Sequence, residues 1–409
     1  MTKRYDIIIS GASYTGLALA CALSQALRGD LAIAVLGASP ATDDKSGVSP
    51  RAFAISAASK RMLDVLGVWP RIEAEAEPVN EIEITDSSLD AGIRPVLLTY
   101  DNHLEEGEPA SFIVQDAVLA AALHQVASEA AGVDLIPLTA QSFTEVPGGV
   151  RVTCANGAEL SASLLVAAEG RRSAVRETAG IKLVTWEYGQ SGICTVVAHE
   201  HPHNGRAVQH FLPSGPFAIL PLPGDRSCVT WSENRQEAKR IMALDDTAFL
   251  DELAKRFGRR LGALALAGPR ASWPLSMHIA RSFIAPRLAL VGDTARGVHP
   301  IAGQGLNLGF RDVAALAESV ADGVRVGLDA GDHEALERYE RWRRFDSTMS
   351  TAAYDGLNRL FSNDSTLLRS FREAGLGLVD RLPAAKSAFI KEAAGVTGNP
   401  PRLLQGQAL

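Results

Sequence analysis

Between residues 287 and 312 the chain places a carboxylate and several glycines where they could hold a cofactor. Residues 287–291 predict a short buried strand, and Gly292 and Asp293 follow it directly. Open α/β sheets bind ligands beyond the carboxyl ends of their strands, so Asp293 would face such a ligand. A strand-to-helix turn without a ligand would also fit, but so many special residues in one stretch favour a cofactor site.

Three glycines then lead into a predicted helix that continues beyond Val313. Gly303, Gly305 and Gly309 would let backbone N–H groups approach a ligand without interference from Cβ atoms. The N-terminal end of a helix carries partial positive charge and favours electron-rich or anionic groups. Strand, carboxylate, glycine-rich turn and helix together predict a cofactor site.

The N-terminal residues carry an incomplete dinucleotide-binding motif. Residues 5–10 predict a buried strand, and Gly11-x-Ser13-x-x-Gly16 leads into a helical run over residues 17–27. In the pattern G-x-G-x-x-G, the middle glycine lets the backbone contact a pyrophosphate at the helix N-terminus. Ser13 occupies that middle position, and its Cβ and hydroxyl should crowd the phosphate or push it outward.

Three further positions bear on the same nucleotide. The second predicted strand, residues 31–36, should end in an acidic residue that bonds the adenosine ribose, but Gly37 stands there. Arg51 could serve the cofactor's phosphates or form a surface ion pair. Gln115 could reach a phosphate or could simply begin the helix that follows it.

A predicted strand over residues 164–168 delivers Glu169 and Gly170 to its end, and Ser173 begins a helix. Arg171, Arg172 and Arg176 follow closely. They form either a solvated positive face or the edge of a ligand site.

The composition is that of a large folded enzyme. The chain has 409 residues, of which 46% are hydrophobic and 21% charged, with a net charge of −7. An acidic balance argues against a nucleic-acid partner. The four cysteines have no C-x-x-C spacing, so we expect neither a zinc site nor a disulfide framework. We expect a cytoplasmic protein, since the N-terminus leaves no room for a signal peptide and no apolar run is long enough to span a bilayer.

A histidine-rich segment invites a metal interpretation. His199, His201 and His203 alternate with Glu200 and Pro202. The proline and the loop setting provide no fixed ligand geometry, so a surface loop is favoured and no metal site is expected.

The middle and the end of the chain predict different architectures. Residues 190–231 read as long antiparallel strands with a turn at 213–216, which cannot belong to a parallel nucleotide-binding sheet. We therefore assign them to a second domain. Residues 333–397 are almost wholly helical in pattern.

The order of the motifs resembles a known family. Gly11-x-Ser13-x-x-Gly16, Arg51, Glu169-Gly170 and the stretch 292–312 follow one another as in FAD-dependent aromatic hydroxylases of the para-hydroxybenzoate hydroxylase type. Within that group the chain looks most like the ubiquinone-biosynthesis hydroxylases. The resemblance covers nearly the whole chain, and its most specific part is His299-Pro-Ile-Ala-Gly-Gln-Gly-Leu-Asn-Leu-Gly-Phe-Arg-Asp312.

Pattern and resemblance together predict an α/β fold. A Rossmann-like FAD-binding domain would be interleaved with an antiparallel-sheet substrate domain, and C-terminal helices would follow. The expected segments are residues 1–78, 106–182 and 276–330 for the FAD-binding domain, 79–105 and 183–275 for the substrate domain, 331–397 for the helical region and 398–409 for a loose tail.

The resemblance also implies roles for individual residues. Gly11 and Gly16 would hold the pyrophosphate, Asp293 would bond the ribityl chain, and residues 300–307 would border the isoalloxazine. No catalytic side chain is required, because the chemistry belongs to the cofactor. The flavin-facing residues would be Pro300, Gly303 and Gln304. The expected cofactor-binding residues are Gly11, Ser13, Gly16, Arg51, Gln115, Gly292, Asp293, Pro300, Gly303, Gly305, Leu306 and Asn307.

The implied reaction uses O2 and NAD(P)H, and a flavin hydroperoxide transfers one oxygen to an aromatic, polyprenyl-phenol type intermediate of ubiquinone biosynthesis. An apolar tail on that small-molecule substrate would explain apolar surface near the C-terminus. Association with the inner-membrane surface or with a multi-enzyme complex stays open. The alternative is a family member that has lost tight FAD binding and acts as a non-catalytic lipid-binding or complex-organising subunit.

Four departures from the family pattern predict weak retention of FAD. They lie on the adenosine–pyrophosphate side of the cofactor, and each lost polar contact is worth about 1 kcal/mol. The four positions are Ser13, Gly37, Ala117 and Glu169.

Overall fold

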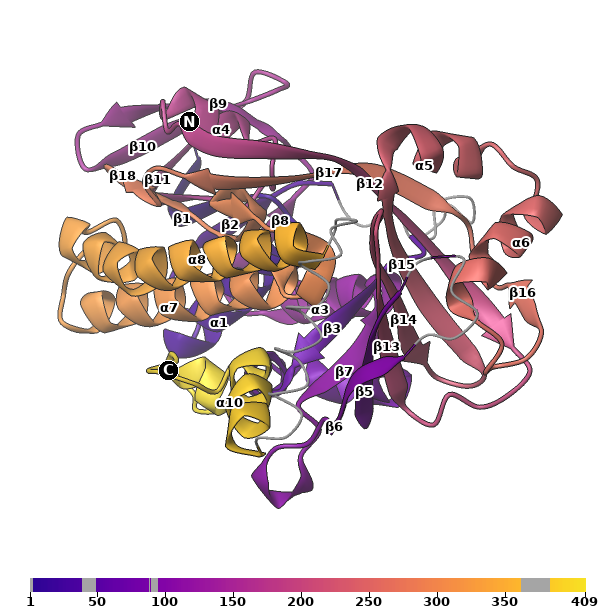
Figure 1. Ribbon diagram of the computed structural model, residues 1–409. Helices are drawn as coiled ribbons and strands as arrows, with labels where there is room; N and C mark the ends of the chain where they lie inside the picture. Colours follow the sequence, from indigo (N-terminus) through magenta and orange to yellow (C-terminus); the bar gives the residue numbers. More distant parts are fainter. Residues whose placement is uncertain (1–2, 39–48, 88, 90–94, 362–382) are drawn as a thin grey trace.

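The computed structural model describes residues 3–38, 49–87, 89, 95–361 and 383–409. Within these ranges the strands form one mainly parallel sheet, one mainly antiparallel sheet and a small third sheet. Figure 1 shows the two large sheets on opposite sides of the molecule, with α8 (His333–Phe361) reaching from one towards the other. The α/β fold with an interleaved antiparallel sheet is confirmed.

The mainly parallel sheet is built around β1, in which Ile7, Ile8 and Ile9 are fully buried. Such continuous apolar runs fit a parallel sheet, because helices cover both of its faces. The strands beside β1 run parallel to it. In spatial order the described strands are β18 (Ile284–Ala285), β19 (Leu288–Leu290), β11 (Glu159–Ala167), β1 (Lys3–Ser10), β2 (Ile33–Leu36) and β8 (Val133–Ile136), and the hairpin of β9 (Ala140–Val146) and β10 (Gly149–Cys154) pairs with β11.

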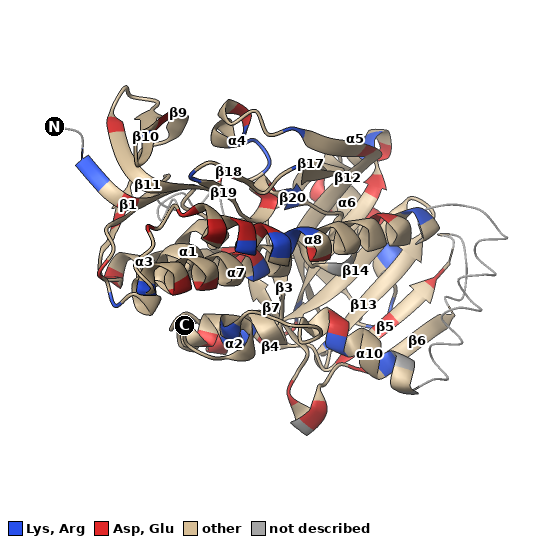
Figure 2. Ribbon diagram, turned by 90° about the vertical axis from the view of Figure 1, so that its left-hand side faces the viewer, with Lys and Arg blue, Asp and Glu red and all other residues tan. Residues whose placement is uncertain are grey.

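Three long helices pack together beside this sheet. The first, α1 (Tyr14–Ala26), contacts both α3 (Asp116–Glu129) and α7 (Gly305–Arg325). The axes of α1 and α7 come close because Gly309 lacks a Cβ, which would lie 2.8 Å from Cγ2 of Thr15. α8 packs against α7. Ion pairs between its own side chains occur along the helix, and Figure 2 shows acidic and basic residues interspersed in it.

The mainly antiparallel sheet confirms the strands predicted for residues 190–231. Its described strands, in spatial order, are β20 (Arg296–Gly297), β17 (Ala271–Ala280), β12 (Leu183–His199), β15 (Arg226–Asn234), β14 (Gly215–Leu222), β13 (Arg206–Leu212), β5 (Glu81–Asp86) and β6 (Val96–Asp101), with β16 (Leu264–Leu266) beside β12. The predicted domain boundary at residues 275 and 276 falls inside β17.

One face of this sheet carries its own apolar core. Phe217 and Trp231 from the sheet pack with Phe249 of the helices that cover it, and all three are fully buried. These helices are α5 (Arg235–Met242) and α6 (Asp246–Phe257), which lie on the side of the sheet remote from β1 (Figure 1). The opposite face is therefore the one turned towards the parallel sheet.

A small sheet lies between the two large ones. It consists of β3 (Ala52–Ser56), β7 (Ser111–Gln115) and β4 (Glu77–Pro78), and α2 (Ala57–Val65) follows β3 directly. The hydroxyl of Ser56 caps α2 by accepting a hydrogen bond from Ser59 N–H.

The prediction of a loose tail after residue 398 is wrong. Residues Arg402–Gln405 form a 3-10 turn, and Leu403 and Leu404 are only 1% and 2% exposed within the main core. Arg402 forms ion pairs with Glu318 and Asp322 of α7. The two buried leucines anchor the segment in the core. Two adjacent leucines form no periodic pattern, so the sequence did not reveal this anchoring.

The C-terminal region is helical where it is described. α8 is followed by α10 (Pro383–Ala394), and residues 362–382, also predicted helical, lie outside the described residues. Residues 43–50, whose polar sequence with Gly and Ser predicts a loop, lie mostly outside them as well. Among the described residues, no helix is both long and apolar enough to cross a membrane.

Candidate functional site

The first glycines of the N-terminal motif are required by packing. Gly11 follows β1 with φ near +120°, and a Cβ there would lie 2.3 Å from the carbonyl oxygen of Ala168. A Cβ on Gly16 would lie 1.9 Å from the carbonyl oxygen of Gly11. Neither contact is tolerable, so both positions must be glycine if the strand ends and α1 are to meet this closely.

Ser13 is the N-cap residue of α1, yet its hydroxyl does not cap the helix. It is exposed, and it has no side-chain hydrogen bond to the first turn. The hydroxyl is therefore not used by the helix, and the crowding of a phosphate by Ser13 stays a prediction.

The other predicted departures behave differently from one another. Ala117 is exposed in the first turn of α3 and leaves no cation there. Gly37 could not be an acidic residue in this backbone, because a Cβ would lie 2.7 Å from the backbone nitrogen and the Cβ of Ala12. The missing ribose-binding acid is thus a consequence of how closely the glycine-rich turn approaches the end of β2.

Glu169 has a role inside the protein. Its carboxylate accepts hydrogen bonds from Ser10 Oγ at 2.7 Å, from Ser173 Oγ and from Val175 N–H at 3.2 Å. It thereby joins the end of β1 to the first turn of α4 (Ala174–Thr178). The side chain of Glu169 is thus used within the protein, and the expected loss of a cofactor contact stays a prediction.

Arg51 and Gln115 are brought together at the edge of the small sheet. Gln115 pairs with Ala52, and the carbonyl oxygen of Arg51 accepts a hydrogen bond from Asp116 N–H. The exposed guanidinium of Arg51 lies over the rings of Phe53 and Trp273, 5.1 and 5.5 Å from their centroids. This stacking holds a cation between the two large sheets.

The strand β19 delivers Asp293 as predicted. Asp293 lies in the 3-10 turn Gly292–Thr294, its side chain is exposed, and no described residue donates a hydrogen bond to its carboxylate. Surrounding protein nevertheless raises the pKa of this carboxyl by desolvation, which the positive charges of Arg296 and Arg51 partly oppose. The carbonyl oxygen of Asp293 is fixed by His278 Nε2 at 2.7 Å.

Behind this turn lies a buried charge cluster centred on Asp312. Its carboxylate accepts hydrogen bonds from Gly292 N–H at 3.0 Å, Arg296 at 2.7 Å and Arg343 Nε at 2.8 Å. All three side chains of the cluster are at most 3% exposed. The cluster ties β19, β20, α7 and α8 into one unit around Asp293.

The glycine-rich turn begins α7 as predicted. Gly303 is exposed with φ near +63°, and Gln304 is the N-cap residue. The first N–H groups of the helix, on Gly305, Leu306 and Asn307, have no carbonyl partner within it and remain available to a ligand. The geometry therefore offers a helix N-terminus beside an exposed carboxylate.

Two predicted ligands use their side chains elsewhere. Asn307 is buried, its Oδ1 accepts from Ser56 N–H at 3.0 Å, and its Nδ2 donates to the carbonyl oxygen of Ala54 at 2.8 Å. Gln304 donates from Nε2 to the carbonyl oxygen of Ala393 in α10 at 3.4 Å. Asn307 thus fixes the start of α7 against β3, and only its backbone is left for a cofactor.

The 3-10 turn Pro300–Ala302 faces the antiparallel sheet. Ile301 packs against Phe211 of β13 in a small apolar cluster. Ile84, Tyr354 and Leu360 pack against the same cluster, so β5 and α8 help to enclose it. An apolar region therefore adjoins the turn.

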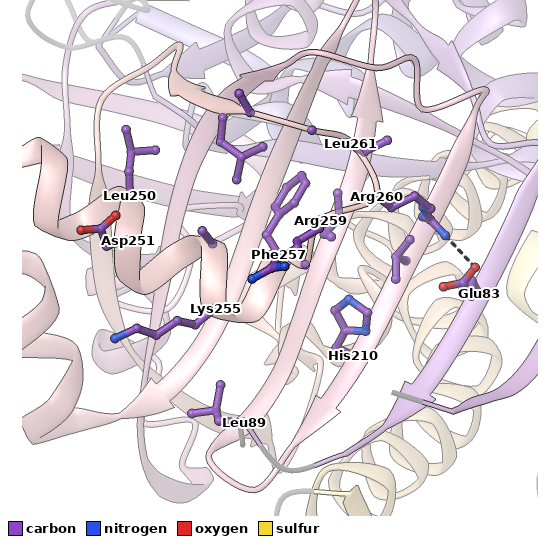
Figure 3. A pocket seen from close by; sticks show the side chains of 17 residues that line it. Glu83, Leu89, His210, Leu250, Asp251, Lys255, Phe257, Arg259, Arg260 and Leu261 are labelled. Carbon is purple, nitrogen blue, oxygen red and sulfur yellow. Dashed lines mark hydrogen bonds and ion pairs between the residues drawn. The ribbon is translucent and has the colours of Figure 1, made fainter. Parts of the chain in front are cut away.

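A pocket of about 1010 Å³ lies elsewhere, on the face of the antiparallel sheet that α6 covers. Figure 3 shows His210 and Phe257 on its walls, with Arg260 paired to Glu83 at 2.7 Å. Side chains alternate along a strand, so Gln209 and Phe211 point to the opposite face. This pocket is therefore on the wrong side of the sheet to be part of the site.

The histidine-rich segment has structural contacts. His199 is buried and bonded to the carbonyl oxygen of His201 and to Ser227, and His203 bonds the carbonyl oxygen of Leu222. His199 belongs to β12, so the expectation of a plain surface loop is only partly right. No metal-binding group of side chains occurs among the described residues.

The geometry fits an FAD. The cradle of Gly11 and Gly16 would accept the pyrophosphate, the unpartnered carboxylate of Asp293 suits ribityl hydroxyls, and the α7 N-terminus suits the electron-rich edge of a flavin.

A family model described as "FAD binding domain" matches residues 4–349. A protein of Rhodospirillum rubrum, "Ubiquinone hydroxylase UbiL", is 40% identical over 100% of this chain and 94% of its own.

The chain belongs to the ubiquinone-biosynthesis hydroxylase family of FAD-dependent aromatic monooxygenases. "Ubiquinone biosynthesis monooxygenase COQ6, mitochondrial" of Danio rerio is 31% identical over 94% of this chain and 89% of its own. Among solved structures, p-nitrophenol 4-monooxygenase PnpA from Pseudomonas putida DLL-E4 shares the fold with a TM-score of 0.79. The two are 17% identical, over 98% of this chain and 100% of that one. The protein is thus an FAD-dependent aromatic-ring monooxygenase, as the sequence predicted.

For a monooxygenase of this family, two groups near the site were missed from the sequence. Tyr188 lies against His299, with ring centroids 5.0 Å apart, and its hydroxyl donates to Asp355 of α8 at 3.0 Å. Arg296 was missed as a partner of Asp312. The glycine beside Tyr188 was the one available signal of an irregular strand, whereas nothing local marks Arg296.

Proposed function

We propose that the protein hydroxylates the aromatic ring of a polyprenyl-phenol type intermediate of ubiquinone biosynthesis, using O2 and NAD(P)H. One observation carries this proposal. The free Asp293 carboxylate and the α7 N-terminus adjoin the apolar cluster of Phe211 and Ile301, in a chain whose full length resembles a ubiquinone hydroxylase.

FAD, when bound, supplies the redox chemistry and the activation of O2. The protein's own contribution is to bind, orient and exclude water. Gly11 and Gly16 let the backbone approach the pyrophosphate, and Arg51 offers a cation held over Phe53 and Trp273. Asp293 would accept hydrogen bonds from the ribityl hydroxyls of bound FAD.

Pro300, Gly303 and the first turn of α7 would border the flavin-ring end of bound FAD. The unpaired N–H groups of Gly305 and Leu306 favour negative charge on a reduced flavin, because they are preorganised and carry no reorganisation cost. The apolar side chains of Phe211 and Ile301 keep the neighbouring space dry, which strengthens these electrostatic interactions.

An apolar substrate tail is supported by the surface of α8. Phe345 and Met349, one turn apart, are 75% and 55% exposed, and Leu357 lies two turns further along. Large exposed apolar side chains at helical spacing are typical of surfaces that meet a lipid or a partner. We propose that this surface attaches the enzyme to a membrane or to a complex where such substrates reside.

The proposal is tested with the purified protein saturated with FAD. NAD(P)H oxidation should accelerate when a phenol with a prenyl chain is added, and hydroxylated product should form in proportion. A protein that binds FAD but shows neither response would instead support the non-catalytic lipid-binding or complex-organising role.

A further inference from the structure

His299 has two ring nitrogens in different environments. Its Nδ1 accepts a hydrogen bond from Ile301 N–H at 3.2 Å and caps the turn Pro300–Ala302. A nitrogen that accepts an N–H bond carries no proton, so the proton of the neutral ring lies on Nε2. His299 is 1% exposed, and burial lowers its pKa to about 4, so the ring is neutral at physiological pH.

The Nε2–H of this ring has no hydrogen-bond partner among the described residues. Buried donors are nearly always paired in native proteins, and an unpaired one costs free energy. An oxygen atom of a ligand would satisfy this donor.

An irregularity of β12 holds the ring in place. Glu187 pairs with Ser276 and Ser191 with Pro274, so β12 carries extra residues between these pairs and bulges. Gly189, with φ near +68°, allows the bulge, and Tyr188 is thereby directed edge-on against His299. Bulges of this kind re-aim side chains beside active sites.

The ring is therefore fixed on two sides. The turn Pro300–Ala302 holds Nδ1, and Tyr188 packs against the ring while its own hydroxyl is held by Asp355. A donor that cannot rotate is suited to orient a ligand, since little entropy is lost on binding.

The place of His299 indicates which ligand. It directly precedes the turn Pro300–Ala302, which would border the flavin of bound FAD, and Ile301 of that turn packs with Phe211 of β13. Gln209, two residues before Phe211 on the same face, also has a buried Nε2 without a partner among the described residues. His299 and Gln209 thus each offer an unpaired N–H donor, one beside the turn Pro300–Ala302 and one on the strand whose Phe211 contacts that turn.

We propose that His299 orients the aromatic substrate, with its Nε2–H donating a hydrogen bond to an oxygen on the substrate ring. This inference rests on the proposed function, because it requires an oxygen-bearing aromatic substrate beside His299. A hydroxyl or carbonyl oxygen on the ring can accept the bond, and the ring is thereby turned to present one carbon to the flavin. An aromatic without an oxygen gains nothing from His299.

Two substitutions separate the roles of the two nitrogens. His299→Asn places an acceptor near the position of Nδ1 and keeps the cap on Ile301 N–H, but it does not reach the position of Nε2. His299→Gln reaches the position of Nε2 with an N–H group and gives up the cap. The probes are 2-geranylphenol and geranylbenzene, which differ only in the ring hydroxyl.

Dissociation constants of both probes are measured on FAD-saturated protein through tryptophan fluorescence, together with the FAD affinity and the melting temperature of each variant. The wild type should bind the phenol about tenfold more tightly than the hydrocarbon, the effect of one hydrogen bond. His299→Asn should bind the two probes equally while its FAD affinity is unchanged, and His299→Gln should keep part of the preference. Hydroxylation by His299→Asn should show a raised KM for the phenol with a smaller change in kcat.

The inference is overturned if His299→Asn still binds the phenol more tightly than the hydrocarbon by the wild-type factor. It is also overturned if His299→Gln binds the two probes equally while His299→Asn still prefers the phenol. If the wild type hydroxylates the phenol but His299→Asn still discriminates, only this inference fails. A wild type that binds FAD but neither probe would overturn the proposed function as well.

Discussion

The carboxylate of Asp312 accepts a 3.0 Å hydrogen bond from the backbone N–H of Gly292. The bond joins the first turns of α7 to the end of β19, so the helix N-terminus and Asp293 are held as one unit by the protein itself. Arg296 and Arg343 bind the same carboxylate. The cofactor site is thereby organised from behind, by a charge that does not face the ligand.

Asp312→Asn should destabilise the protein by about 3–5 kcal/mol, because the buried guanidinium of Arg296 loses its counter-charge and that of Arg343 keeps only Asp346. Urea unfolding measures the change. The control is Asp134→Asn, which breaks the exposed pair with Lys3 and should cost at most about 1 kcal/mol. Equal losses in the two variants would show that the buried cluster contributes no more than a surface ion pair.

Gly309→Ala should cost about 1–3 kcal/mol, because the new Cβ would lie 2.8 Å from Cγ2 of Thr15 and force α1 and α7 apart. Thr15→Ser removes that methyl group, so the double variant should recover most of the loss. Urea unfolding of both single variants and the double variant measures the coupling. If the free-energy losses of Gly309→Ala and Thr15→Ser simply add in the double variant, the two side chains do not contact each other.

The stability of the protein should fall between about pH 6.5 and 4 in part through His299. The folded state holds its pKa near 4, whereas the unfolded chain has the ordinary value of about 6.5. Protons therefore bind the unfolded state first as pH falls. The contribution of His299 is complete above pH 6.5 and is lost towards pH 4, by about 3 kcal/mol in total.

In His299→Asn this part of the pH dependence should disappear. The burial of His278 also lowers its pKa, and that contribution should remain in both proteins. Unfolding free energies at pH 7.5, 5.5 and 4.5 provide the comparison. Parallel curves for the wild type and the variant would show that His299 is not buried as a neutral ring.

Ser13→Gly should tighten FAD binding about tenfold, because the hydroxyl and Cβ no longer crowd the pyrophosphate and the middle glycine of the motif is restored. Equilibrium titration of the apoprotein, followed by flavin fluorescence, gives the affinity. The prediction of weak retention would be refuted if the wild type kept one FAD per chain through dialysis and Ser13→Gly showed no higher FAD affinity.

Gly37→Asp should not restore an adenosine contact. The added Cβ would lie 2.7 Å from the backbone of Ala12, so the substitution should lower the melting temperature and leave FAD affinity no better. Tighter binding in this variant, measured by the same titration, would mean that the turn at Ala12 can move aside.

Sequence patterns were sufficient for the fold because the signals were local and strong. The apolar run of β1 with its glycines, and the alternation of β13 and β14, each specify one element. The tail was mispredicted because the burial of Leu403 depends on the distant surface of α7, which leaves no periodic trace in the sequence.

The site was only partly predictable, because several of its side chains contact residues that are distant in the sequence. Asp293 and Gly303 are exposed where the sequence placed them, and their binding of FAD stays a prediction. The contacts of Glu169 were missed because its partners, Ser10 and Ser173, meet it only in the folded protein. Asn307 also binds residues remote in sequence, and its neighbours in the chain do not reveal this.

The most direct test is hydroxylation under ¹⁸O2. FAD-saturated protein is supplied with NADH or NADPH and 2-geranylphenol, and the product is analysed by mass spectrometry. One ¹⁸O atom should enter the ring for each NAD(P)H oxidised. The proposed function would be contradicted if the protein bound FAD but the phenol did not accelerate NAD(P)H oxidation and no ¹⁸O entered the ring.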